Sequence, residues 1–127
     1  MIRLTLVALA MGMATTSDTR ELDAALKDRT PGTPENCLRG FGTQTRSPQI
    51  IDNHTLLYRD GSAIWRNDLP AACPGLEPAA ILVTEVQGGQ LCRNDMIYTL
   101  QRGGIGIPGA RCRLGLFTPY RKAKPSR

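Results

Sequence analysis

The 127-residue chain is poor in the residues and motifs on which most catalytic sites depend. It has a single histidine, a single tryptophan, and only 5% aromatic residues. It contains no G-x-S-x-G nucleophile elbow, no P-loop and no internal repeat. Its length predicts one domain, which excludes a multidomain enzyme, a large barrel and a repeat array.

Basic residues outnumber acidic ones by 16 to 11, which gives a formal charge of +5. The body of the chain is nearly balanced, and four of the basic residues lie in the last seven positions, 121–127. No basic face interleaved with aromatic residues is visible in the sequence. The sequence therefore predicts no nucleic-acid partner.

The first 14 residues have the pattern of a secretory signal peptide. Arg3 forms a short positive region, and the apolar run Leu4–Ala14 is too short to span a bilayer. Small residues at Gly12 and Ala14 predict cleavage after Ala14. A buried N-terminal element of a cytosolic protein is the alternative, but we favour export to the periplasm or the cell exterior.

The four cysteines agree with an oxidising compartment. They are even in number and widely spaced, and no C-x-x-C pair indicates a zinc site, so we predict two disulfides and no bound metal. Three pairings are possible. We favour the nested pairing, Cys37–Cys112 with Cys73–Cys92, because it would join the first and last strands of the domain. The sequential pairing ranks second and the crossed pairing third.

Turn residues divide the sequence after Cys37 into short segments typical of strands. Residues 15–36 predict a linker, a short helix or a disordered arm, 37–120 a β domain, and 121–127 a disordered basic tail. Asp60-Gly61 predicts a type I′ hairpin turn. The predicted fold is mainly β, a small antiparallel sandwich or partly open barrel of five to six strands, stapled by disulfides. The predicted strands are 43–51, 54–59, 63–67, 81–86, 96–101 and 111–118.

Six short elements, in order along residues 37–118, resemble a family of small exported proteobacterial proteins whose function is unassigned. The resemblance implies an exported β-rich domain with paired cysteines, and it implies no catalytic residue. The elements are Cys37-Leu38-Arg39, Ile51-Asp52 with Thr55-Leu56, Asn67-x-Leu69, Cys73-Pro74-Gly75-Leu76, Leu91-Cys92 with Asp95, and Cys112-x-Leu114-Gly115-x-Phe117.

The strongest catalytic candidate in the sequence is His54, which Asp52 would orient as a general base for Ser47 or Ser62. We favour an exposed turn histidine, because no local signature supports a nucleophile. A carboxylate pair for glycoside hydrolysis is a second candidate, but these aspartates fit better as turn residues. The aspartates are Asp52, Asp60, Asp68 and Asp95.

The glycine-rich segment 103–109 lacks the lysine and helix context of a phosphate-binding loop, so we interpret it as a hairpin loop. Trp65, with Tyr58 and Arg66, forms a contact surface if Trp65 faces outward. A lone tryptophan in a small domain is more often buried in the core, and we favour that alternative.

These observations predict an exported, non-catalytic binding or interaction module of the cell envelope. We expect a monomer without a cofactor or a transmembrane span, whose partner is an envelope protein or an anionic envelope component. The alternative is a small periplasmic inhibitor of a hydrolase. A small enzyme is the third hypothesis, disfavoured by the missing catalytic motifs.

Overall fold

The computed structural model describes residues 17–38, 48–86, 88–100 and 107–123. Several predicted features lie outside these residues: the signal peptide, the first part of the 43–51 strand with Ser47, most of the 103–109 loop, and the end of the basic tail.

The described residues form one short helix and ten short strands, and all strand pairs are antiparallel. The predicted mainly β, antiparallel fold is therefore confirmed, although ten strands replace the expected five to six. The elements are α1 (Ser17–Ala25), β1 (Arg29–Pro31), β2 (Cys37–Leu38), β3 (Gln49–Asp52), β4 (Thr55–Asp60), β5 (Ala63–Asp68), β6 (Ile81–Thr84), β7 (Leu91–Cys92), β8 (Met96–Leu100), β9 (Cys112–Arg113) and β10 (Phe117–Lys122).

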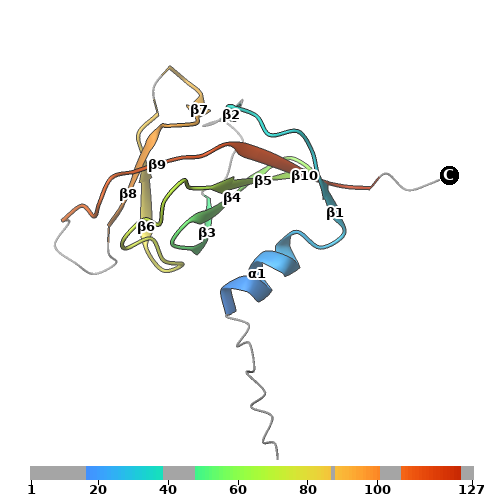
Figure 1. Ribbon diagram of the computed structural model, residues 1–127, viewed down its shortest axis with the longest axis horizontal. Helices are drawn as coiled ribbons and strands as arrows, with labels where there is room; N and C mark the ends of the chain where they lie inside the picture. Colours follow the sequence, from blue (N-terminus) through green and yellow to red (C-terminus); the bar gives the residue numbers. More distant parts are fainter. Residues whose placement is uncertain (1–16, 39–47, 87, 101–106, 124–127) are drawn as a thin grey trace, which may run out of the picture.

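The strands form three sheets (Figure 1). The largest has the order β1-β10-β5-β4-β3, so the last strand of the chain lies inside the sheet, between the first strand and β5. A three-stranded sheet has the order β6-β8-β9, and β2 pairs with β7 in a two-stranded sheet. The two smaller sheets lie on one side of the large sheet, and α1 covers part of its other face (Figure 1).

Both faces of the large sheet are buried in its middle. Leu56, Tyr58 and Trp65 face the main core, whereas Leu57 and Ile64 face α1. This double burial explains why Thr55–Tyr58 are all buried and show no alternation of apolar and polar residues. Of the alternatives for residues 15–36, the short helix forms, and Leu22, Ala25 and Leu26 pack against the second face.

The β4–β5 hairpin differs by one residue from the predicted turn. Asp60 pairs with Ala63, so the two central residues are Gly61 and Ser62. Gly61 has a φ of 58°, and Ser62 is not among the residues with positive φ. A positive φ at the first central position alone is the pattern of a type II′ turn, which takes glycine there. The type I′ prediction was wrong because it centred the turn on Asp60.

The two predicted disulfides are confirmed, but the nested pairing was wrong. Cys37 pairs with Cys92, and Cys73 pairs with Cys112, which is the crossed arrangement. Cys37 and Cys92 lie directly opposite each other on β2 and β7, with their Cα atoms 4.0 Å apart. The expected Cys37–Cys112 bridge does not form because the strand paired with β2 is β7, so Cys92 is the cysteine within reach.

No helix in the described part of the chain is long and apolar enough to cross a membrane.

The disordered tail was predicted to start at residue 121, which is too early. Arg121 and Lys122 belong to β10, opposite Thr30 and Arg29 of β1. This pairing could not be predicted from the sequence. Each of the two segments contains a proline, Pro31 or Pro119, and neither shows a clear alternation of apolar and polar residues. Pro31 is tolerated because β1 is an edge strand. The Pro119 carbonyl accepts the Gly32 N–H at 2.7 Å, so the nitrogen of Pro119 also faces β1, and its missing N–H leaves the pairing with β5 intact.

Candidate functional site

The predicted contact surface of Tyr58, Trp65 and Arg66 does not form. Tyr58 is fully buried, and its ring packs edge-on against Phe117 with centroids 5.7 Å apart. Trp65 is only 7% exposed. Tyr58 and Trp65 lie opposite each other on the core side of the sheet, and strand alternation places Arg66 on the other side. The favoured alternative, a core tryptophan, is therefore correct.

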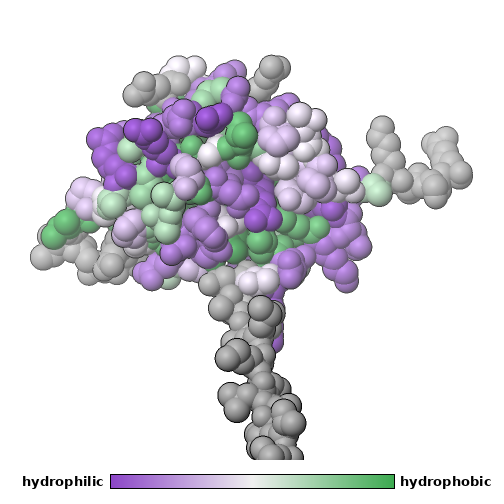
Figure 2. Space-filling view, in the orientation of Figure 1, coloured by the Kyte–Doolittle hydropathy of each residue, from purple (hydrophilic) through white to green (hydrophobic). Residues whose placement is uncertain are grey.

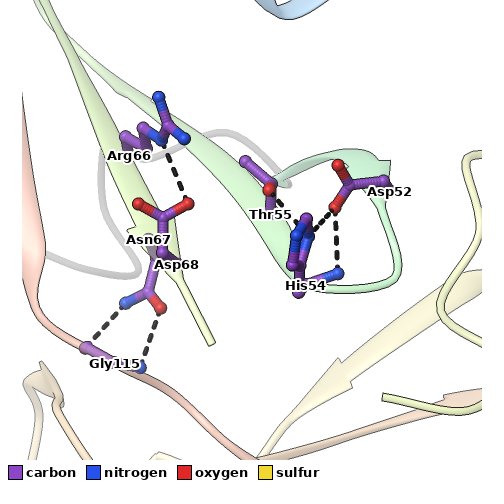
Figure 3. Close-up of polar contacts among 7 residues, drawn as sticks. All are labelled: Asp52, His54, Thr55, Arg66, Asn67, Asp68 and Gly115. Carbon is purple, nitrogen blue, oxygen red and sulfur yellow. Dashed lines mark hydrogen bonds and ion pairs between the residues drawn. The ribbon is translucent and has the colours of Figure 1, made fainter. Parts of the chain in front are cut away.

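His54 lies in the β3–β4 turn with its side chain 55% exposed (Figure 3). Asp52 accepts a hydrogen bond from the His54 backbone N–H at 2.9 Å, which closes an Asx turn. The Asp52 carboxylate also contacts His54 Nδ1, and the Thr55 hydroxyl lies 3.1 Å from that same nitrogen. A catalytic triad needs the orienting carboxylate and the nucleophile on opposite ring nitrogens. The geometry therefore supports an exposed turn histidine.

The Asp52 carboxylate stays ionised because its turn surrounds it with donors. Partial burial raises the pKa of Asp52, but hydrogen bonds from the His54 backbone, the His54 ring and Thr55 together lower it below its ordinary value. A carboxyl with a lowered pKa is a poor general acid. The other three candidate aspartates also have structural roles. Asp68 pairs with Arg66 at 3.0 Å, and Asp95 accepts a hydrogen bond from the Cys92 N–H at 2.7 Å. Asp60 is the last residue of β4, at the hairpin turn.

Arg66 and Tyr120 lie on the face of the sheet that carries α1. Burial lowers the pKa of the Arg66 guanidinium, but the Asp68 carboxylate and the Tyr120 phenol outweigh that effect and raise it. Arg66 is therefore a neutralised, partly covered cation, and not a free contact residue.

Asn67 forms a buried polar contact that the sequence did not predict (Figure 3). It is fully buried on β5, donates to the Gly115 carbonyl at 2.9 Å and accepts the Gly115 N–H at 2.8 Å. A β carbon at Gly115 would lie 2.1 Å from the Asp68 carbonyl oxygen, so only glycine fits there. Asn67 and Gly115 both belong to the sequence elements that resemble the exported family. Their contact has a structural role, because it fixes the segment before β10.

A cluster of basic residues lies at one end of the large sheet; we call it the basic pole and define it as Arg29, Arg59, Arg121 and Lys122. Three chain segments meet here: β1, the β4–β5 hairpin and the end of β10. Arg59 lies opposite Ile64, which is opposite Tyr120, and Arg121 and Lys122 follow directly. Lys122 in turn pairs with Arg29. This end of the molecule is at the right in Figure 1, and its surface is hydrophilic to neutral in Figure 2.

The four cations of the basic pole keep their charge available. None of the ion pairs among the described residues includes them. Arg29 donates to the backbone carbonyls of Ser62 and Tyr120, at 2.7 and 3.1 Å, which positions the guanidinium without neutralising it. The Arg121 guanidinium lies 5.6 Å from the centre of the Trp65 ring. Asp28 and Asp60 lie in the turns at this end, so the basic residues outnumber the acidic ones two to one.

The sequence missed the basic pole because it assigned Arg121 and Lys122 to a disordered tail. Only the pairing of the first and last strands brings them to Arg29 and Arg59. Elsewhere in the described residues, no group of three or more His, Cys, Asp or Glu side chains is placed to hold a metal ion.

Comparison with known proteins gives no match to a family model, a curated protein or a solved structure. The resemblance to an exported proteobacterial family therefore stays a prediction.

Proposed function

We propose that the chain is an exported, non-catalytic binding module that holds an anionic component of the cell envelope at its basic pole. The observation that carries this proposal is the meeting of four cations from three segments, without an ion-pair partner among the described residues.

The arrangement of the basic pole suits a ligand with several negative charges. Neighbouring strands lie about 4.8 Å apart, so Arg29 of β1, Lys122 of β10 and Arg59 of β4 present separated charges on the face that carries α1. Arg121 adds a fourth charge at the same end of the sheet, on the opposite face beside Trp65. Guanidinium groups bind phosphate and carboxylate oxygens through two parallel hydrogen bonds. Near an anionic lipid surface each such residue contributes about 1 kcal/mol, and the contribution falls as salt screens the charges.

Export is supported by the cysteines and by the predicted signal peptide. All four cysteines are paired, and disulfides persist in the periplasm and outside the cell but are rare in the cytosol. The ligand that the basic pole would meet in these places is a phosphate- or carboxylate-bearing component of the envelope.

The proposal is tested with vesicles of phosphatidylglycerol and, for comparison, of phosphatidylcholine. We expect sedimentation with the anionic vesicles only, weakened by added salt. Replacing two pole residues, Arg59→Gln with Lys122→Gln, should weaken binding roughly 30-fold, because two charges of about 1 kcal/mol each are lost.

The matched control is Arg93→Gln with Arg113→Gln, which removes the same net charge from two exposed positions, one in the turn after β7 and one on β9. It should bind almost as the unchanged chain does. Equal losses for the two double variants would show that net charge alone drives binding and would refute a specific pole. Absence of binding to anionic vesicles at low salt would also refute the proposal.

A further inference from the structure

The edge strands of this fold differ in how well they are protected against pairing with another chain. β1 contains Pro31 and Arg29, and β3 is bulged between Ile50 and Asp52. β9 is only two residues long. β6 is the exception, because its four residues contain no proline, bulge or charge, and Ile81 is 42% exposed. Proline, charge and bulges are the usual devices that block edge pairing.

The register of β6 shows which backbone groups point away from its only partner, β8. The Glu85 N–H donates to the Met96 carbonyl at 2.9 Å, so Glu85 is in a hydrogen-bonded pair. Such pairs recur at every second residue of an antiparallel ladder. Val83 and Ile81 therefore bond to β8, and the N–H and C=O groups of Leu82 and Thr84 point outward.

A cavity of about 310 Å³ opens beside this edge. It lies between β6 and β3, and its walls include Pro48, Ala80, Ile81 and Leu82. Among the described residues that line it, Glu21 of α1 is the charged one. Glu21 accepts a hydrogen bond from neutral Gln49 at 2.7 Å, so its negative charge is not neutralised there.

We propose that the β6 edge and this cavity form a second binding site, which takes an extended peptide segment of a partner protein as an added strand. Main-chain bonds to Leu82 and Thr84 hold the segment, an apolar side chain contacts the Ile81 wall, and a lysine or arginine reaches Glu21. This is the β-augmentation mode of peptide recognition. The site is separate from the basic pole and does not depend on its function.

Charge selects a basic partner segment over a second copy of this chain. The β6 strand of a second copy, Ile81–Thr84, carries no lysine or arginine that could reach Glu21, and Glu85, which follows β6, is already paired with Arg111. A partner segment with a lysine or arginine supplies the opposite charge that a second copy of β6 lacks.

The probe is an end-blocked hexapeptide of alternating valine and lysine, titrated into the intact chain by fluorescence anisotropy. We expect saturable binding and about tenfold weaker binding for Thr84→Pro, since a tenfold change corresponds to the loss of roughly one outward hydrogen bond. Thr84→Val keeps the N–H and should bind normally. Glu21→Gln should weaken the valine–lysine peptide but not a valine–glutamate one, and a fully N-methylated peptide should not bind.

Amide hydrogen exchange in the unchanged chain tests the same site without a variant. The Leu82 and Thr84 amides should exchange fast in the free chain and slow on adding the peptide, while Val83 is protected throughout. The proposal is overturned if no saturable binding occurs up to about 1 mM peptide, or if Thr84→Pro folds and binds equally well. A dimer that Thr84→Pro dissociates would also overturn it, because the occupant would then be a second copy.

Discussion

Two fully buried polar residues illustrate how this core treats polar groups. Asn67 satisfies both ends of its amide on the backbone of Gly115, and it thereby anchors the approach to β10. Tyr58 buries its hydroxyl without a hydrogen-bond partner in the described part of the chain, and burial raises the pKa of this phenol well above its ordinary value. Asn67 therefore supports the fold, whereas the Tyr58 hydroxyl costs stability.

Replacing Tyr58 by phenylalanine should stabilise the chain by about 1 kcal/mol, because an unsatisfied hydroxyl is removed and the ring contact with Phe117 remains. The gain should appear as a higher midpoint in urea. Because the folded pKa lies above the unfolded value of about 10, the unchanged chain should also lose stability as pH rises above 10, and the variant should lose less.

The control for this substitution is Tyr98→Phe, at a half-buried position of β8, where a change within about 0.5 kcal/mol is expected. A clear loss of stability in Tyr58→Phe would show that the hydroxyl has a partner after all.

At the scale of elements, the sequence predicted those whose residues carry a strong local signal. The β4, β5 and β8 strands lie within one residue of their predicted bounds, because each is a compact run rich in apolar residues ended by turn residues. The strands β2, β7 and β9 are only two residues long, so they cannot show a periodicity of their own. They form only because a partner strand elsewhere in the sequence lies beside them. The basic pole was missed for the same reason, because its strands β1 and β10 pair across almost the whole chain.

The place of β10 in the sheet makes Arg121 and Lys122 part of the fold. Deleting residues 121–127 removes the pairing with Arg29 and Thr30 and the contact of Arg121 with Trp65. We expect a loss of about 2–3 kcal/mol, from the two backbone hydrogen bonds that Arg121 exchanges with Thr30, about 1 kcal/mol each, and a cation–π contact of about 0.5–1. Urea unfolding measures it, and deletion of 124–127 alone is the control. An unchanged midpoint for the longer deletion would mean that β10 ends before Arg121.

At the scale of the whole molecule, the crossed disulfides join regions whose proximity no local pattern encodes. The two bridges close overlapping loops with sequence separations of 55 and 39 residues, and each should stabilise the chain by about 4 kcal/mol through the entropy of the unfolded state. The number and spacing of cysteines predicted that bridges form. Their partners depend on which strands pair, and that information is not local.

Chemical cleavage of the unreduced chain distinguishes the pairings. Cutting after Trp65 and Met96 gives pieces ending at 65, spanning 66–96, and starting at 97. With crossed bridges all three pieces should stay covalently joined, whereas nested bridges would release 66–96. A second cleavage, after Glu77 and Glu85, separates the part of the chain with Cys37 and Cys73 from the part with Cys92 and Cys112. Crossed bridges should keep these two parts joined, whereas sequential bridges would release them from each other. Mass spectrometry without reduction reads both results.

The insertion of β10 between β1 and β5 also sets the order in which the molecule can be completed during synthesis. Without residues 117–122, β1 has no partner and the sheet consists of β5, β4 and β3. The five-stranded sheet therefore cannot close until Lys122 has left the ribosome, and pairs so distant in sequence form slowly. Until residues 117–122 have emerged, a nascent chain of this protein stays incompletely folded, which is the condition in which a polypeptide can still be threaded through a narrow channel.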